Sequence, residues 1–454
     1  MTDLLHPDTE KHRDGFEPDG HPVHEGPVGR LKRTEAWRSV FRHPSLDTPR
    51  GRALQSFSNV FLHVYPVRVP AKVLRNRYSW RLGYIATVLF MVLVSTGVYL
   101  MFFYSPSVNS AYGDMQQLRT GVGFGQLIRN VHRWAAHLMV LVVFAHMVRV
   151  FLAGAYKRPR QFNWVLGMGL LLITLGFSFT GYLLPWDQLS YWAVTVGTNL
   201  ANYVPVVGGL ARDLLIGGAQ IGQSTLERFY ALHVAVLPLT LALLLTVHIW
   251  RVRKDGFAVK RGGTGPFGAD DPDAPVTTDP VVVSPVLAQE PGSRVRLLGV
   301  VERQSVVAEE QLTDDTVFTW PHLLIRHAVV GLGTVAVCLA LGVAFAAPLR
   351  GIANPNLTPE PAKAPWYFVG LQELLSHFDP LVAGILIPGG AVLAFVLLPY
   401  IDRNPATEAR NRKVAIVIFT IVGVIAVALT VIGLAFRGPG WKFVNPLTHS
   451  YIEL

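Results

Sequence analysis

The chain has 454 residues, of which 51% are hydrophobic and only 15% are charged. Soluble domains carry about a quarter charged residues, so this composition excludes an ordinary water-soluble enzyme and a disordered chain. In so apolar a chain the formal net charge of +10 indicates membrane topology signals, and we expect no nucleic-acid partner. The single cysteine, Cys338, leaves no disulfide framework, no Cys-X-X-Cys site and no c-haem motif.

The first 80 residues are polar and basic, and we predict a cytoplasmic N-terminal extension over residues 1–80. Its early histidines suit a solvated tail better than a metal site. The stretch Pro49–Val64 places apolar side chains at helical spacing beside arginines, which predicts an amphipathic helix lying on the lipid surface.

Seven stretches of about 20 apolar residues follow, each long enough to cross a bilayer core of about 30 Å as a helix. They are Leu82–Tyr104, Val131–Phe151, Val165–Leu184, Leu232–Ile249, Leu323–Ala347, Leu381–Tyr400 and Val414–Phe436. We therefore predict an all-α integral membrane protein. Its expected parts are a four-helix bundle over residues 81–254, a cytoplasmic linker over residues 255–318 and three further helices over residues 319–454.

Lys and Arg cluster in the loops that alternate crossings place on the same side as the N-terminus. Such basic loops normally stay in the cytoplasm. The pattern predicts a multi-pass protein of a bacterial-type cytoplasmic membrane, with its N-terminus in the cytoplasm and its C-terminus outside.

Four histidines inside the predicted spans carry the strongest functional signal, because ionisable groups are costly in a bilayer. The second span holds His132 and His146, which are 14 residues apart (146 − 132), and the fourth holds His233 and His248, which are 15 apart (248 − 233). At 1.5 Å per residue these intervals rise about 21 and 22 Å. Two such helices can hold two haems, each iron taking one imidazole from each helix. Four interhelical hydrogen-bonding histidines are the alternative, which the matched spacing disfavours; His137 stays unassigned.

Glycines repeat the same interval in the first and third spans. Gly83 and Gly97 differ by 14 (97 − 83), as do Gly167 and Gly181 (181 − 167). Glycine lets a helix approach a flat macrocycle without a side chain in the way. The two intervals therefore favour a four-helix bundle around two stacked porphyrins.

Basic residues beside the histidines are candidates for binding charged groups of a cofactor or substrate. Arg133 follows His132 and Arg149 lies one turn beyond His146, so each can pair with a haem propionate or extend to the membrane surface. Arg253 and Lys254 follow the fourth span and can meet quinone or propionate oxygens, or act only as topology charges.

Three segments resemble the cytochrome b subunit of quinol:cytochrome c oxidoreductases, the bc and bf complexes. They are LIRNVHRWAAHLMVLVVFAHMVRVFLAGAYKRPR, GYLLPWDQLSYWAV and GQSTLERFYALHVAVLPLTLALLLTVH, and they cover most of residues 80–256. The resemblance is to the bf branch in three features: the 15-residue histidine interval, PWDQ and GQSTLERFY. In that branch the front and rear parts are separate polypeptides. Here the 255–318 linker is expected to join them.

The resemblance implies that His132 and His233 ligate a low-potential haem near the outer surface, and that His146 and His248 ligate a high-potential haem near the cytoplasm. It also implies a reaction. Quinol oxidation at an outer site sends one electron to a Rieske iron–sulfur protein and a c-type cytochrome, and the other through both b haems to an inner quinone. Protons are released outside and taken up inside, and the complex is expected to be a dimer.

The rear part resembles the family more loosely, through APWYFVGLQELL. Trp366 and Tyr367 match the family's Pro-Glu-Trp-Tyr, but Pro365 replaces the glutamate that accepts a proton from quinol. We take Glu373 as the hypothetical substitute, because a carboxylate can bond to quinol and then turn to water. Glu360 and Asp187 are weaker candidates.

The cysteine that carries a covalent haem in the bf branch also has no counterpart here. The comparable position holds Arg81, and Cys338 suits apolar packing in the fifth span. We therefore predict two non-covalent b haems and no covalent haem.

Two alternatives stay open at this point. A membrane-anchor b cytochrome of a hydrogenase or formate dehydrogenase would also use four bundle histidines, but it does not require the three rear helices or the PWYF segment. A haem-free transporter or scaffold is the second alternative.

Overall fold

The computed structural model describes residues 64–74, 80–257, 316–448 and 451. The chain divides into two compact units, Met1–Val67 and Arg68–Leu454, and the helices described below all belong to the second unit. The predicted histidine tail and surface helix, and the linker between residues 258 and 315, lie outside the described residues.

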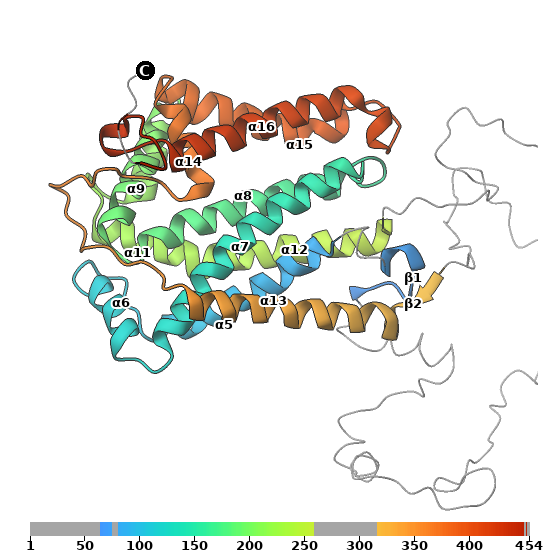
Figure 1. Cartoon of the computed structure of the whole chain (residues 1–454), viewed down its shortest axis with the longest axis horizontal. Helices are drawn as coiled ribbons and strands as arrows, with labels where there is room; N and C mark the ends of the chain where they lie inside the picture. The colour runs from blue at the N-terminus through green and yellow to red at the C-terminus, as the bar shows by residue number, and fades with distance from the viewer. Residues whose placement is uncertain (1–63, 75–79, 258–315, 449–450, 452–454) are drawn as a thin grey trace, which may run out of the picture. The chain divides into compact units, whose positions relative to one another are not determined.

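Seven helical spans in the described ranges are long and apolar enough to cross a membrane (Figure 1). They are Leu82–Met101 (α5), Gly125–Leu152 (α7), Gln161–Leu183 (α8), Gln223–Asp255 (α11, a π-helical turn and α12), Thr319–Ala344 (a π-helical turn and α13), Leu381–Ile401 (a π-helical turn and α15) and Lys413–Ala435 (α16). The predicted all-α fold with seven spans is confirmed. Several helices extend beyond the predicted stretches, because hydropathy marks only the apolar part of a helix whose polar ends continue it.

Shorter elements connect these spans. They include α6 (Ala111–Thr120), α9 (Gln188–Leu200), α10 (Gly208–Ile216), α14 (Trp366–Leu375) and the antiparallel strands β1 (Arg68–Pro70) and β2 (Thr316–Phe318). Within the fourth span, α11 comprises Gln223–Ala231. The strands pair with Arg68 opposite Phe318, so they bring the chain before α5 next to the chain before α13.

The rear helices pack directly on the front bundle: α13 lies against α5 and α7, and α15 lies against α8. Gly342 of α13 allows the close approach to α7, because a Cβ there would lie 2.6 Å from the Val131 side chain. Asn130 and Arg129 of α7 then donate hydrogen bonds of 2.8 Å to the carbonyls of Gly342 and Ala347. Close backbone approach plus satisfied polar groups is how membrane helices associate.

A second polar cluster joins the front and rear parts at the other end of α7. The Arg412 guanidinium is buried, and it donates to the Tyr156 hydroxyl at 3.1 Å and to the Phe151 carbonyl at 3.0 Å. Tyr156 donates to Asp402, which also pairs with Lys157 at 3.0 Å. Burial would raise the pKa of Asp402, but these hydrogen bonds lower it below its ordinary value, so the carboxylate stays charged.

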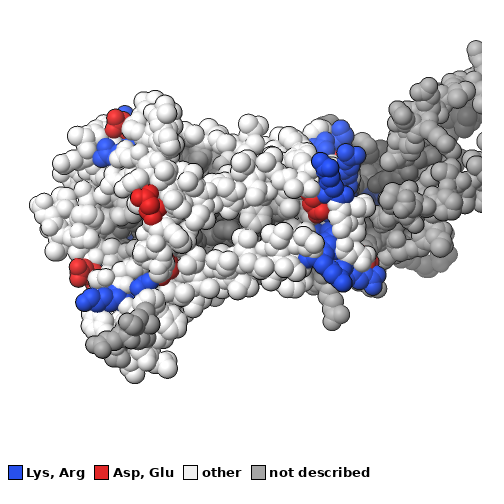
Figure 2. Space-filling view, turned by 90° about the horizontal axis from the view of Figure 1, so that it is seen from above, with Lys and Arg blue, Asp and Glu red and all other residues white. Residues whose placement is uncertain are grey.

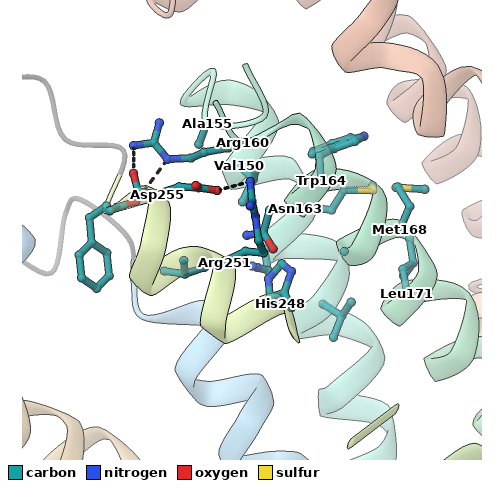
Figure 3. A pocket seen from close by; sticks show the side chains of 17 residues that line it. Val150, Ala155, Arg160, Asn163, Trp164, Met168, Leu171, His248, Arg251 and Asp255 are labelled. Atoms are coloured by element: carbon teal, nitrogen blue, oxygen red, sulfur yellow. Dashed lines mark hydrogen bonds and ion pairs between the residues drawn. The ribbon is translucent and has the colours of Figure 1, made fainter. Parts of the chain in front are cut away.

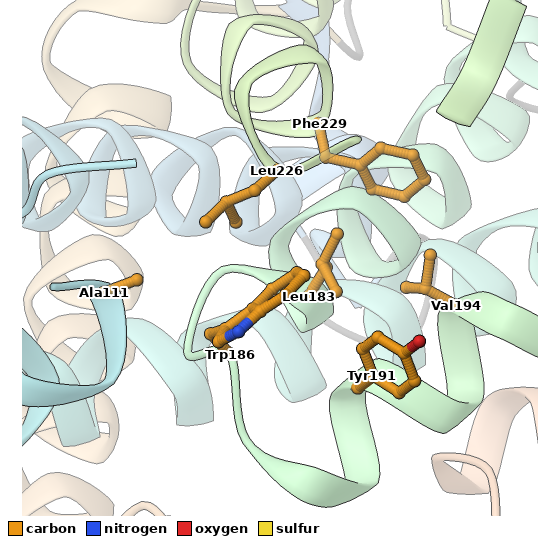
Figure 4. Close-up of a cluster of buried hydrophobic side chains, with 7 residues drawn as sticks. All are labelled: Ala111, Leu183, Trp186, Tyr191, Val194, Leu226 and Phe229. Carbon is orange, nitrogen blue, oxygen red and sulfur yellow. The ribbon is translucent and has the colours of Figure 1, made fainter. Parts of the chain in front are cut away.

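An aromatic and aliphatic core closes the bundle at the end that carries α6, α9 and α11 (Figure 4). Its buried side chains are Ala111, Leu183, Trp186, Tyr191, Val194, Leu226 and Phe229. Asp187 of the PWDQ segment caps α9 by accepting the Ser190 N–H at 2.9 Å, and it accepts the Arg350 N–H at 3.0 Å. Asp187 therefore anchors the loop after α13. Because its carboxylate is engaged in these hydrogen bonds, the structure does not favour Asp187 as a proton acceptor.

Charge is unevenly distributed along the helices. Figure 2 shows the largest group of Lys and Arg side chains at one end, and a mixture of basic and acidic side chains at the other end beyond a wide, mostly uncharged band. We call the end that carries the loop after α7, the end of α12 and the start of α16 the basic end, and the end with the aromatic core the opposite end. Basic side chains at the basic end include Lys157, Arg160, Arg251, Lys254 and Arg412.

Candidate haem and quinol sites

Two of the predicted histidines face each other across the bundle near the opposite end. The rings of His132 in α7 and His233 in the π-helical turn Leu232–Val236 have centroids 6.4 Å apart. This separation accommodates one iron with two imidazole bonds of about 2 Å each. Among the described residues, no group of three or more His, Cys, Asp or Glu side chains is placed to hold a metal ion. Each pair instead suits an iron whose other ligands belong to a porphyrin.

Two threonines fix which nitrogen of each ring is available. Thr96 Oγ1 lies 2.8 Å from His132 Nδ1, and Thr180 Oγ1 lies 3.2 Å from His233 Nδ1. Both hydroxyls already donate their hydrogen to a backbone carbonyl one turn earlier, at 2.7 and 2.9 Å. Each hydroxyl oxygen therefore accepts from Nδ1–H, which leaves the Nε2 lone pair of both rings free to bind iron.

The four predicted glycines each face one of the four predicted histidines. An added Cβ would lie 2.5 Å from His233 Cε1 at Gly181 and 3.4 Å from His132 Cε1 at Gly97. The corresponding distances are 3.3 Å for Gly83 with His146 and 3.6 Å for Gly167 with His248. In the structure, each glycine permits a close contact with an imidazole ring. The sequence predicted instead that the glycines permit a close contact with the macrocycle.

The second histidine pair lines a cavity of about 160 Å³ at the basic end (Figure 3). His146 and His248 share its wall with Gly167, Arg160, apolar side chains and the ion pair of Arg251 with Asp255, in which a guanidinium nitrogen lies 3.1 Å from the carboxylate. Arg251 Nε is buried without a hydrogen-bond partner among the described residues, as is Asn163 Oδ1. A buried donor left unpaired in an apolar cavity fits the carboxylate of a bound group such as a propionate.

A π-helical turn explains why the fourth span needs 15 residues where the second needs 14. Residues Leu232–Val236 form this turn immediately before α12, and Pro238 follows it. Proline has no N–H and its ring clashes with the carbonyl four residues earlier, which favours a wider turn. The extra residue is taken up there, so His233 and His248 present the same face of the helix.

None of the basic residues predicted as ligands lines the basic-end cavity. Lys254 is exposed and lies over the Trp250 ring at 5.4 Å, and neither Lys254, Arg253 nor Arg149 lines the basic-end cavity. Arg160 and Arg251 do, and sequence reasoning missed them. Arg251 follows His248 by three residues, a spacing that places both on one helix face and could have identified it.

The rear residues Trp366 and Tyr367 begin α14 and lie beside α7. The Trp366 indole N–H donates to His137 Nδ1 at 3.0 Å, and the Tyr367 ring lies 6.0 Å from the His137 ring. Burial raises the pKa of the Tyr367 phenol, while Arg133 and a hydrogen bond with Ser178 act in the opposite direction. The charge of the predicted Arg133 therefore acts on the predicted PWYF segment.

Glu373 has a different environment from the one its hypothetical role requires. It is fully buried, and Arg437 donates to its two oxygens at 2.7 and 3.0 Å. Trp441 and His377 lie 3.2 and 3.0 Å from the carboxylate. Burial would raise the pKa of Glu373, but the bonds from Arg437 and His377 lower it below its ordinary value. This geometry is that of a structural ion pair and does not support a carboxylate that turns from quinol to water.

Two histidine pairs at two depths of a four-helix membrane bundle, with a glycine facing each ring and threonines holding the rings of one pair, define a class: transmembrane b-type haem proteins. Comparison with known proteins gives the family. Residues 68–256 match the family model described as cytochrome b/b6/petB, and residues 352–451 match the one described as cytochrome b (C-terminal)/b6/petD.

Individual relatives agree with the family models. Cytochrome b6 of Synechococcus sp. (strain RCC307) is 48% identical over 177 residues, which are 39% of this chain and 81% of that protein. Cytochrome b6 of Prochlorococcus marinus (strain MIT 9211) is 47% identical over the same length and shares. The chain therefore belongs to the cytochrome b/b6 family of electron-transport proteins, with a b6-like front part joined to a rear part, and it binds b-type haem.

A solved structure titled "Hyperthermophilic respiratory Complex III" matches the fold. Its TM-score is 0.64 at 23% identity, and the match covers 89% of this chain and 91% of the other. At this identity the likeness concerns the fold alone.

The threonine bonds lead to a first testable expectation. Thr180→Val removes the acceptor of His233 Nδ1 while keeping the side-chain shape, so affinity for haem at the opposite end should fall about 10- to 100-fold. Haem-to-protein ratio and redox titration measure this. Thr174→Val, on the same helix and with a hydroxyl bonded only to the Leu170 carbonyl, is the matched control. Equal haem content in both variants would contradict the assignment.

Proposed function

We propose that the chain is the di-haem cytochrome b subunit of a respiratory or photosynthetic bc-type complex. In this role it oxidises quinol near the opposite end and reduces quinone near the basic end, coupled to proton translocation. The facing His132 and His233 rings, each held through Nδ1 by a threonine, carry the proposal. The pair His146 and His248 at the basic end supports a second haem. When bound, the b haems would supply one-electron carriers at two depths in the membrane.

The quinol site we propose is built from Trp366 and Tyr367 of α14. The Tyr367 ring lies beside the His137 ring of α7, and the positive charge of Arg133 favours the phenolate form, so the phenol would present its O–H to a quinol oxygen there. Phe368 packs edge-on against Phe179 of α8, with ring centroids 6.4 Å apart, and so connects this segment to the front bundle.

At the basic end, Arg160 and Arg251 would hold carboxylates of the haem there. Arg133 stays a proposed partner for a propionate of the haem between His132 and His233, and Arg149 for a propionate of the haem between His146 and His248. Arg253 and Lys254 stay proposed ligands of the inner quinone, since both follow His248 at the mouth of the bundle.

The reaction needs partners, because the chain has one cysteine and cannot hold an iron–sulfur cluster or a c-type haem. We propose a Rieske iron–sulfur protein, a c-type cytochrome subunit and a dimeric complex, in line with the fold of the Complex III neighbour. The basic end would face the cytoplasm of a bacterial-type membrane, because Lys and Arg gather there.

The hydrogenase or formate dehydrogenase anchor is not favoured. Such an anchor requires only the front histidine bundle, whereas residues 352–451 match the rear family model and Trp366 and Tyr367 contact α7.

Purification of the chain with its native partners tests the proposal. We expect a b-type α band in the reduced-minus-oxidised spectrum and quinol-dependent reduction of cytochrome c, assayed with menaquinol and ubiquinol analogues. An intact, haem-loaded complex that reduces cytochrome c with neither quinol would refute the function, and a folded chain without the band would refute haem binding.

A further inference from the structure

His137 is a half-buried histidine that takes no part in the two haem sites described above. It lies in α7, five residues beyond His132 (137 − 132), and its ring is half-buried between the Trp134 and Tyr367 rings, with centroids 5.5 and 6.0 Å away. Its Nδ1 accepts the Trp366 indole N–H at 3.0 Å. The two partners are 229 residues apart in the chain, so this bond connects the front bundle to the start of α14.

The donor fixes the state of the imidazole. An indole N–H can only donate, so His137 Nδ1 must carry a lone pair and the ring must be neutral with its hydrogen on Nε2. A protonated ring would place a second N–H against the indole N–H and break the bond. While Trp366 is in place, His137 is therefore an acceptor that holds α14 and is not available at Nδ1 to take a proton.

The position of Trp366 sets the position of the proposed quinol site. Trp366 is the first residue of α14, and Tyr367 follows it directly, with its ring 6.0 Å from the His137 ring of α7. The residue before the helix is Pro365, which offers no side-chain hydrogen bond to hold this end. The His137 bond thus ties the N-terminus of α14 to α7 at the place where Tyr367 must stand.

We propose that His137 is a positioning residue of the quinol site, which accepts the Trp366 indole N–H and thereby sets the distance of Tyr367 from α7. The inference rests on the proposed quinol oxidation and deepens it. It assigns to a neutral histidine the task of holding the loop that, in this chain, lacks the family's glutamate.

Three variants of the complete complex test the bond. His137→Phe keeps a ring but removes the acceptor, and Trp366→Phe removes the donor; each should lower kcat/KM for quinol about tenfold, in line with the loss of one buried hydrogen bond. The double variant should be no worse than either single variant. His137→Asn places an amide oxygen near the Nδ1 position and cannot take up a proton, so it should restore most of kcat/KM with an unchanged pH profile.

Trp134→Phe is the matched control, because it also removes an indole hydrogen bond from α7 to the rear part, to the Phe345 carbonyl at 2.8 Å, while it keeps an aromatic ring beside His137. It should keep kcat/KM within about twofold. Haem spectra should be unchanged in all variants.

Wild-type-like activity of His137→Phe, or fully additive losses in the double variant, would overturn the inference. Loss in His137→Asn equal to that in His137→Phe, with a shifted pH profile, would make His137 a proton acceptor instead. Failure of the wild-type complex to oxidise quinol would refute the proposed function itself.

Discussion

Replacing His233 with leucine should remove the haem of the opposite end and leave that of the basic end in place. The iron between His132 and His233 would lose one of its two imidazoles, and an apolar leucine offers no replacement ligand. His146 and His248 line a separate cavity, so they should be unaffected. We expect about half of the b-type α band to remain. A haem-to-protein ratio and a redox titration that shows a single midpoint measure the outcome.

Gly181→Ala should have nearly the same effect without removing any ligand. Its Cβ would lie 2.5 Å from His233 Cε1 and 3.0 Å from Nδ1, so the ring must move away from Thr180 and from the iron position. Gly167→Ala is the matched control, since its Cβ would lie 3.6 Å from His248 Cε1, an ordinary contact. Full haem content in Gly181→Ala would show that the ring can shift freely, and would weaken the claim that glycine positions it.

The sequence predicted the spans and the paired histidines because both depend on local periodicity. Apolar stretches of membrane length identify helices, and the 14-residue intervals identify faces of helices. It did not predict the threonines that hold the rings, although both stand in a Thr-Gly pair, at Thr96–Gly97 and Thr180–Gly181. The π-helical turn that absorbs the extra residue of the fourth span depends on how Pro238 fits the bundle, which spacing alone does not reveal.

Contacts between the front and rear parts could not be predicted in the same way. Trp366 and His137 are 229 residues apart, and Arg412 and Tyr156 are 256 apart, so no local pattern relates them. Glu373 shows the consequence. As a carboxylate seven residues beyond Trp366 it was a reasonable proton acceptor, but Arg437, which is 64 residues further along the chain, turns it into a buried ion pair.

Glu373→Gln should therefore destabilise the protein strongly, whatever its effect on turnover. The neutral amide would leave the buried Arg437 guanidinium without its countercharge, and breaking a buried pair in this way costs about 3–5 kcal/mol. Thermal unfolding of the purified complex measures the loss. The double variant Glu373→Met with Arg437→Met removes both charges, and such apolar replacements are often neutral, so most of the stability should return.

The pH dependence of unfolding provides an independent check on the pair. Because the folded-state pKa of Glu373 lies below its ordinary value of 4.5, its contribution to stability is complete above that value and is lost as the pH falls through the lowered pKa. The wild-type protein should thus lose this stability in acid, whereas the Met–Met variant should lose less. Turnover of the Met–Met variant then separates the two roles of the carboxylate. Retained quinol oxidation would show that the Glu373–Arg437 pair is structural. A stable but inactive variant would instead support Glu373 as a proton acceptor.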